Sequence, residues 1–205
     1  MINESMNFIL VGVGGQGTIL ASDILAELGL KLGRDVKQAE VHGMSQRGGS
    51  VVSHLRWGPV VYSPIIPRGG ADILIAFEKL EAARFIHYLR PGGMALVNDA
   101  QIAPASLSTG AVYPTDESLQ AILAQSTGQV YWIHANEIAH RLGNSKTANV
   151  VLLGALSALL DCDLSAWLDV LKLRVPPKSM DLNRQAFEAG RAAREANRMV
   201  LEPVR

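Results

Sequence analysis

Short apolar runs alternate along the chain with segments in which apolar residues recur at helical spacing. Residues 8–11 are continuously apolar, which is typical of a strand covered on both faces. In residues 18–32, leucine and isoleucine return every three or four positions, which predicts an amphipathic helix that ends at Gly33. Further strands are predicted at four places: 36–41, 71–77, 94–99 and 129–135. Further helices are predicted at three places: 78–89, 115–126 and 136–143.

Two apolar segments in the middle of the chain favour a mixed sheet over an entirely parallel one. Residues 50–57 and 60–63 are separated by a Gly-Pro pair, and this turn signal predicts an antiparallel hairpin. A short strand is also expected at Thr109–Tyr113. Because strands and helices otherwise alternate, the pattern predicts an α/β fold.

The last part of the chain is predicted to be helical. Residues 147–160 are apolar on nearly every side, which indicates a buried helix, whereas 164–175 and 182–201 are amphipathic. Pro176 and Pro177 form a stiff connection between the two amphipathic segments.

No repeat or low-complexity segment divides the sequence. We therefore expect a single domain over residues 1–205, with an α/β core at 6–160 and C-terminal helices at 161–205.

Charge and hydropathy bear on which partners the protein binds and in which compartment it is found. The 19 basic residues balance the 19 acidic ones, so no general field attracts nucleic acid or an anionic membrane. The N-terminal residues lack the basic and apolar regions of a secretory signal, and the apolar run at 150–160 is too short to span a bilayer. We expect a cytoplasmic protein.

The sequence contains one cysteine, Cys162. A single cysteine excludes an internal disulfide and cannot supply the several thiolates that an iron–sulfur cluster requires. Asp161 and Asp163 flank it and disfavour a thiolate, so we expect an inert thiol. No histidine pair has the spacing of metal ligands, and no metal site is predicted.

A glycine-rich loop follows the first predicted strand. Gly12, Gly14 and Gly17 match G-x-G-x-x-G, in which missing Cβ atoms let backbone N–H groups approach a pyrophosphate at a helix N-terminus. The predicted cofactor-binding residues of this loop are Gly12, Val13, Gly14, Gly15, Gln16 and Gly17. Such a loop also serves simply to start a helix close to a strand. A third reading is a dinucleotide site in which Glu40 binds a ribose.

A second polar loop, residues 42–50, contains the predicted catalytic residues Ser45, Gln46 and Arg47. A hydroxyl, an amide and a guanidinium suit an anionic or carbonyl-bearing ligand, and Gly48 and Gly49 let the backbone pass close to it. Loops that follow the strands of an open α/β sheet meet at one edge, so both loops are expected to line one crevice. The alternative is an exposed, solvated surface loop.

Asn149 is the notable polar residue of the predicted buried helix. It must find a hydrogen-bond partner there, and a loop backbone is the expected one. Neither a P-loop lysine nor a nucleophile elbow is present, so the residues favour a chain that binds and positions a ligand.

Five segments together resemble the gamma-type domain of the 2-oxoacid:ferredoxin oxidoreductases: GVGGQG, EVHGMSQRGGSVVSHLR, ADILIAFE, TANVVLLGAL and NRQAFEAG. The resemblance covers nearly the full chain and is weakest at residues 100–130. It implies Rossmann-like layers with a mixed, partly curled sheet. It also implies a heteromeric oxidoreductase that decarboxylates a 2-oxo acid, passes electrons to ferredoxin and transfers the acyl group to coenzyme A. An aryl side chain on the acid is part of the resemblance.

The same resemblance places thiamine diphosphate and the iron–sulfur clusters in a partner alpha subunit. The present chain then completes the active site and holds the diphosphate of coenzyme A on residues 12–17, while Ser45, Gln46 and Arg47 approach the substrate or acyl acceptor. Two other classes stay open from the residues alone. They are a stand-alone NAD- or FAD-dependent oxidoreductase and a regulatory module that binds coenzyme A or a nucleotide.

Overall fold

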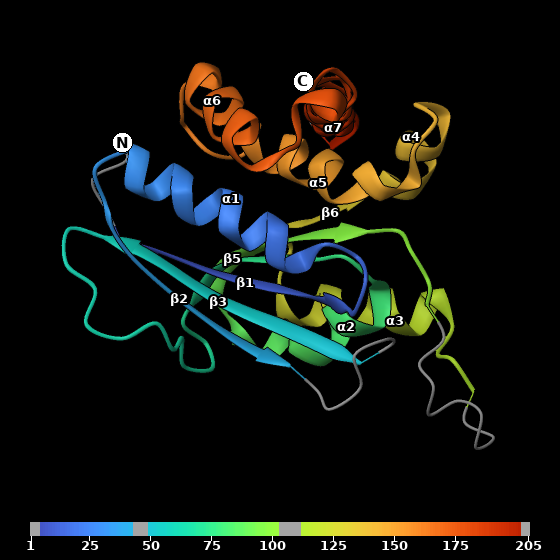
Figure 1. Cartoon of the computed structure of the whole chain (residues 1–205). Helices are drawn as coiled ribbons and strands as arrows, with labels where there is room; N and C mark the ends of the chain where they lie inside the picture. The colour runs from blue at the N-terminus through green and yellow to red at the C-terminus, as the bar shows by residue number, and fades with distance from the viewer. Residues whose placement is uncertain (1–4, 43–48, 103–111, 202–205) are drawn as a thin grey trace.

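The computed structural model describes residues 5–42, 49–102 and 112–201. Its centre is a six-stranded mixed sheet in the order β2-β3-β1-β4-β5-β6 (Figure 1). The strands are β1 Met6–Val13, β2 Asp35–His42, β3 Ser50–Gly58, β4 Ala71–Ala76, β5 Leu89–Asn98 and β6 Val130–Ile133. The α-helices are α1 Thr18–Lys31, α2 Lys79–Phe85, α3 Asp116–Ser126, α4 Ala135–Arg141, α5 Ala148–Ser157, α6 Leu164–Arg174 and α7 Met180–Leu201. The predicted α/β fold with a mixed sheet and C-terminal helices is confirmed.

The antiparallel part of the sheet differs from the predicted hairpin. β1, β4, β5 and β6 run parallel, while β3 lies antiparallel between β1 and β2. Residues 60–63 form no strand, so the hairpin of 50–57 with 60–63 was wrong. The reason is that both edges of β3 are already occupied: Arg56 pairs with Asn7 on one side and with Lys37 on the other.

One predicted helix is shorter than expected, and one predicted strand falls mostly outside the described residues. The helix predicted at 78–89 ends earlier, because α2 passes into a 3-10 turn at Ile86–Tyr88 and β5 then begins at Leu89. The strand expected at Thr109–Tyr113 lies mostly outside the described residues, and its described end, 112–113, is not a strand.

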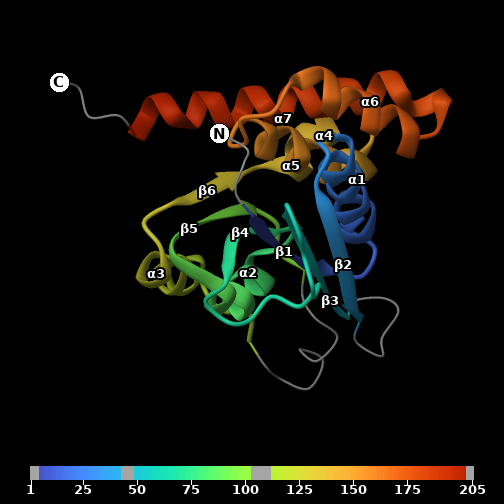
Figure 2. The same cartoon turned by 90° about the vertical axis from the view of Figure 1, so that its left-hand side faces the viewer.

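Helices cover the sheet unequally on its two faces (Figure 2). On one face, α1, α4, α5, α6 and α7 pack on Phe8, Leu10, Leu55 and Ile75 in the larger apolar core. On the other face, α2 and α3 pack on the smaller core, which includes Val97. The central strands β1 and β4 are therefore buried on both sides, as their continuous apolar runs predict.

The predicted buried helix is confirmed as α5, whose residues from Asn149 to Ser157 are all buried. It packs so closely on α7 that a Cβ on Gly154 would lie 1.9 Å from the Phe187 carbonyl oxygen. Likewise, a Cβ on Gly190 would lie 1.9 Å from the Val151 carbonyl oxygen. None of the described helices is both long and apolar enough to cross a membrane.

Candidate functional site

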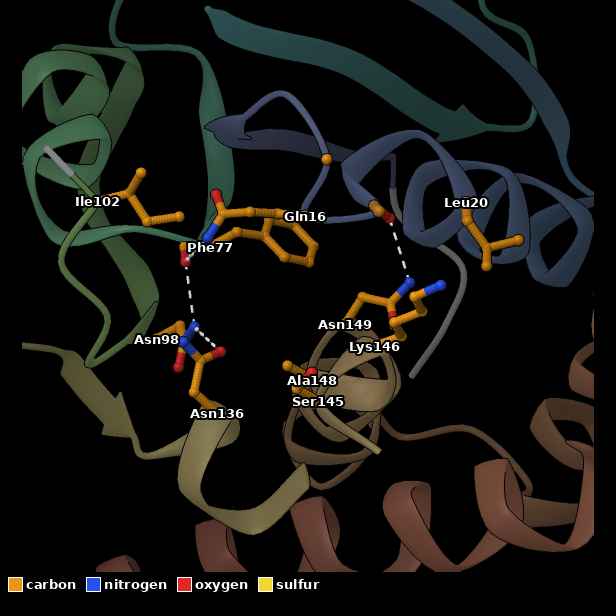
Figure 3. Close-up of a pocket in the computed structure, with 12 residues that line it drawn as sticks. Gln16, Leu20, Phe77, Asn98, Ile102, Asn136, Ser145, Lys146, Ala148 and Asn149 are labelled. Atoms are coloured by element: carbon orange, nitrogen blue, oxygen red, sulfur yellow. Dashed lines mark hydrogen bonds between the residues drawn. The ribbon is translucent and has the colours of Figure 1, made fainter. Parts of the chain in front are cut away.

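A cleft of about 400 Å³ lies at the carboxyl edge of β1, β4 and β5 (Figure 3). Its volume lies within the roughly 300–1,000 Å³ that small-molecule sites occupy. The lining residues come from the glycine-rich loop, the ends of β4 and β5 and the segment after β5, the 3-10 turn Ser145–Thr147, and the first turns of α1, α4 and α5: Gly15, Gln16, Gly17, Leu20, Phe77, Asn98, Ile102, Asn136, Ser145, Lys146, Ala148 and Asn149. Three of the predicted loop residues, Gly15, Gln16 and Gly17, are among them.

The glycines of the loop have different roles. Gly12 is packed too closely for a side chain, because a Cβ there would lie 2.8 Å from Thr18 Oγ1 and 3.0 Å from Phe77 Cβ. Gly17 adopts a left-handed conformation (φ 75°) and begins α1 without any side-chain cap. Gly15 also has a positive φ of 101°, and a Cβ there would meet nothing within 4 Å. The open side of the loop is therefore at Gly15.

Gln16 closes the loop from within. Its Oε1 accepts from the Val13 N–H at 2.7 Å, and its Nε2 donates to the Phe77 carbonyl oxygen at 2.7 Å. The side chain thus ties the end of β1 to the end of β4. This arrangement leaves Gln16 as a fixed wall of the cleft, with both polar ends of its amide already hydrogen-bonded.

Asn98 continues this network at the end of β5. It is 1% exposed, and its Nδ2 donates to the Phe77 carbonyl oxygen at 3.1 Å and to Asn136 Oδ1 at 3.2 Å. Its Oδ1 accepts from the Ala135 N–H at 3.0 Å, at the start of α4. A buried amide at the end of β5 therefore fixes the end of β4 and the start of α4 relative to each other (Figure 3).

Asn149 joins α5 to the glycine-rich loop. Its Nδ2 donates to the Gly17 carbonyl oxygen at 3.3 Å, and its Oδ1 accepts from the Val150 N–H at 2.9 Å. The expectation that this buried amide binds a loop backbone is confirmed.

Lys146 supplies positive charge to the cleft. It lies on the 3-10 turn Ser145–Thr147, is exposed, and forms no ion pair within the described part of the chain. The first N–H groups of α1 have no intrahelical acceptor, and their dipole favours an anion. Lys146 and the loop at Gly15–Gly17 together suit a phosphate-bearing ligand.

The second predicted loop is placed only in part. Ser45, Gln46, Arg47 and Gly48 lie outside the described residues. The described end of that loop, Gly49, meets the glycine-rich loop, because its carbonyl oxygen accepts from the Gly14 N–H at 2.9 Å. The ends of the two loops therefore lie at the same edge of the sheet.

Several lining residues were missed from the sequence: Phe77, Asn98, Asn136 and Lys146. Phe77 and Asn98 stand directly at the ends of apolar strand runs, which is the position that an open α/β sheet presents to its ligand. The sequence therefore contains a signal, the end of an apolar strand run, for both Phe77 and Asn98. Lys146 follows a helix end in a polar turn, and no spacing rule links it to the glycine-rich loop 130 residues away.

Glu40 is not placed as a dinucleotide site requires. In the dinucleotide fold the acidic residue ends the strand beside β1. Here β3 occupies that place, and Glu40 pairs with Ser53, which in turn pairs with Leu10. Two strand spacings, about 10 Å, separate Glu40 from β1.

Cys162 is half-buried, and burial together with the nearby Asp161 carboxylate raises the pKa of its thiol. Asp163 instead caps α6, since its Oδ1 accepts from the Ser165 N–H at 3.0 Å. This raised pKa agrees with the expectation of an inert thiol at Cys162. Among the described residues, no group of three His, Cys, Asp or Glu side chains is arranged to hold a metal ion.

Comparisons with known proteins agree with this architecture. The family model of pyruvate ferredoxin/flavodoxin oxidoreductase matches residues 7–193. The Indolepyruvate oxidoreductase subunit IorB of Pyrococcus horikoshii is 42% identical over 197 residues, which cover 94% of this chain and 98% of that one.

Solved structures have the same fold. The gamma subunit of a keto/oxoacid ferredoxin oxidoreductase from Geobacter sulfurreducens has a TM-score of 0.68 and 27% identity, covering 93% of this chain and 99% of that one. A 2-oxoglutarate:ferredoxin oxidoreductase from Magnetococcus marinus, solved with 2-oxoglutarate, coenzyme A and succinyl-CoA, has a TM-score of 0.73 and 19% identity, covering 95% and 32%. The chain belongs to the pyruvate ferredoxin/flavodoxin oxidoreductase family, as a subunit of a 2-oxoacid:ferredoxin oxidoreductase.

Proposed function

We propose that this chain is the small subunit of an oxidoreductase that converts indolepyruvate, or a related arylpyruvate, to an acyl-CoA with ferredoxin as electron acceptor. Support for the substrate class comes from the 42% identity to the Pyrococcus horikoshii indolepyruvate oxidoreductase subunit over nearly the full length of both chains. We also propose that residues 1–205 act as one domain, since α7 packs tightly on α5.

The role of this chain within that enzyme is to bind coenzyme A in the cleft. The observation that carries this proposal is the Lys146 ammonium, which has no ion-pair partner among the described residues and lies in the same cleft as the open loop at Gly15. Lys146 and the backbone of Gly15 and Gly17 would hold the diphosphate. The polar N–H groups and the cation fit an anionic ligand, and Leu20 and Ile102 offer apolar walls to its uncharged part.

The partner alpha subunit would carry thiamine diphosphate and the iron–sulfur clusters. Thiamine diphosphate supplies the electron sink that makes decarboxylation of a 2-oxo acid possible. The contribution of this chain is to orient the acyl acceptor and to neutralise its charge, which converts an encounter in solution into a positioned one. Ser45, Gln46, Arg47, Gly48 and Gly49 belong to the loop proposed to approach the substrate or acceptor.

Reconstitution of the complex tests this function. The chain would be co-expressed anaerobically with a candidate alpha subunit, and coenzyme A-dependent reduction of a viologen dye would be measured with indolepyruvate, phenylpyruvate, pyruvate and 2-oxoglutarate. We expect activity from the complex only, with preference for the aryl acids. Preference for pyruvate or 2-oxoglutarate would contradict the substrate class. No complex, together with tight NAD binding by the isolated chain, would support the stand-alone alternative instead.

A further inference from the structure

The segment that follows β5 forms one wall of the cleft and is fixed by the start of α2. Ile102, in this segment, lines the cleft, and Figure 3 shows it on the opposite side from Lys146. The Lys79 N–H donates to the Ala100 carbonyl oxygen at 3.0 Å. The Ile102 N–H donates to Glu78 Oε1 at 3.2 Å. Two successive residues after β4 therefore hold the backbone on either side of residue 101.

Glu78 is the centre of this attachment. Its carboxylate is 1% exposed, and its Oε2 accepts from the Glu81 N–H at 2.8 Å, which caps α2. Its Oε1 accepts from the Tyr113 hydroxyl as well as from the Ile102 N–H. A buried carboxylate needs such donors, because an unsatisfied charge there is costly. The position of Ile102 thus depends on a carboxylate that three donors hold in place.

Tyr113 fixes the orientation of that carboxylate. Its hydroxyl also accepts from the Leu80 N–H at 3.2 Å, so it bridges Glu78 and the first turn of α2. Burial, together with the Glu78 carboxylate, raises the pKa of Tyr113, so its hydroxyl keeps the proton that it donates. The side chain of Tyr113 does not line the cleft.

A second contact supports the same segment. Lys79 is 7% exposed, and its Nζ lies 3.1 Å from Asp99 Oδ1 and 2.7 Å from Asp116 Oδ1. These two carboxylates belong to the segment after β5 and to the start of α3. Lys79 therefore anchors the base of the segment, whereas Glu78 and Tyr113 act at Ile102 itself.

We propose that Tyr113 and Glu78 are positioning residues for the acyl acceptor, because they hold Ile102 as the apolar wall of the cleft. The inference rests on the proposed function. With the diphosphate at Lys146, the wall across the cleft contacts the uncharged pantetheine arm. Tyr113 acts on the acceptor only through Glu78 and Ile102, and it touches neither coenzyme A nor the reacting atoms.

A double-mutant cycle in the reconstituted complex tests this chain of contacts. Ile102→Ala removes apolar contact with the acceptor and should raise the KM for coenzyme A roughly tenfold. Tyr113→Phe removes one hydrogen bond to Glu78 and should raise it about threefold to fivefold. The double variant should have the KM of Ile102→Ala alone, because the two residues act in series. The kcat at saturating coenzyme A should stay within about twofold of the wild type in all three.

Two further variants separate positioning from general loss of structure. Glu78→Gln keeps an oxygen acceptor for Tyr113 and Ile102, and should restore most of the affinity that Glu78→Ala loses. Tyr88→Phe is the matched control, because Tyr88 stacks on Phe85 and meets the edge of His54, away from Glu78. It should leave the KM unchanged. Melting curves of each complex check that the folded state persists.

The outcomes distinguish failure of the positioning role of Tyr113 and Glu78 from failure of the coenzyme A proposal. Additive effects of Tyr113→Phe and Ile102→Ala, or no effect of Tyr113→Phe, would overturn the positioning role. A raised KM in Lys146→Ala with no effect of Ile102→Ala would also overturn it and leave the coenzyme A proposal standing. If neither Lys146→Ala nor Ile102→Ala changed the KM for coenzyme A, both proposals would be overturned.

Discussion

Gln16 and Asn98 donate to the same acceptor, the carbonyl oxygen of Phe77, at 2.7 Å and 3.1 Å. These side chains come from the glycine-rich loop and from the end of β5, and Phe77 follows β4 between them. One backbone oxygen therefore joins two segments that are 82 residues apart in sequence. The cleft is built around a fixed polar network, which leaves the ligand to be held by the groups that remain free.

Replacing Asn98 with Ala should destabilise the fold. The change removes the donor to Phe77 and the acceptor of the buried Ala135 N–H, and an unsatisfied buried polar group costs about 1–3 kcal/mol. We expect the free energy of unfolding in urea to fall by about 2–4 kcal/mol. Asn136→Ala, at the exposed end of the same network, is the control and should cost less than about 1 kcal/mol. Equal losses in the two variants would contradict the central position of Asn98.

Gly17→Ala should be more harmful than Gly33→Ala, although both glycines have a positive φ, of 75° and 73°. At Gly33 a Cβ meets nothing within 4 Å, whereas at Gly17 it would lie 2.5 Å from Asn149 Nδ2. Both variants incur about 1–2 kcal/mol of backbone strain, and Gly17→Ala also displaces Asn149. Urea denaturation should rank them in that order. Adding Asn149→Ala to Gly17→Ala should relieve part of the clash, and an additive loss would count against this contact.

His54 should make the fold sensitive to mild acid. Burial lowers the pKa of His54 below its ordinary 6.5, and its Nδ1 accepts from the Ile66 N–H at 3.2 Å. Below pH 6.5 the unfolded chain therefore binds a proton that the folded chain excludes, so this stabilisation is full above pH 6.5 and is lost as the pH falls. Unfolding free energies measured between pH 7.5 and pH 5 should fall less steeply for His54→Asn, which keeps an acceptor. The same slope in both proteins would refute this role.

Cys162 should react slowly with iodoacetamide. Because burial and Asp161 raise its pKa, little thiolate is present at pH 8. The alkylation rate of the native chain, followed by mass spectrometry, should be well below that of the urea-unfolded chain. Asp161→Asn should increase the native rate modestly. A native rate equal to the unfolded one would mean that the thiol is not shielded.

The sequence predicts the local elements of the fold well, because apolar runs and helical spacing are local signals. The strand 8–11, the helix that ends at Gly33 and the buried helix around Asn149 all follow from them. Strand pairing is not local. The Gly-Pro pair at 58–59 does mark the end of β3, where the chain bends, yet β2 and β1 already occupy both edges of β3.

The candidate site was predicted only in part, for a similar reason. Glycine spacing locates the loop at residues 12–17, but it does not tell which members face the ligand. Gln16 lies within the motif, but both polar atoms of its amide are hydrogen-bonded within the protein and close the loop. Asn98 stands at the end of an apolar strand run and could have been identified, whereas Lys146 reaches the cleft through tertiary packing that no periodicity connects to the motif.

The most direct test of the coenzyme A role is the KM for coenzyme A of the reconstituted complex carrying Lys146→Ala. Loss of one charged contact to the diphosphate should raise this KM about tenfold, and the remaining binding should depend less on salt. The kcat at saturating coenzyme A should be preserved, and Lys178→Ala, at an exposed lysine on the turn Pro177–Ser179, should behave as the wild type. A KM for coenzyme A that is unchanged in Lys146→Ala would contradict the assignment of the cleft.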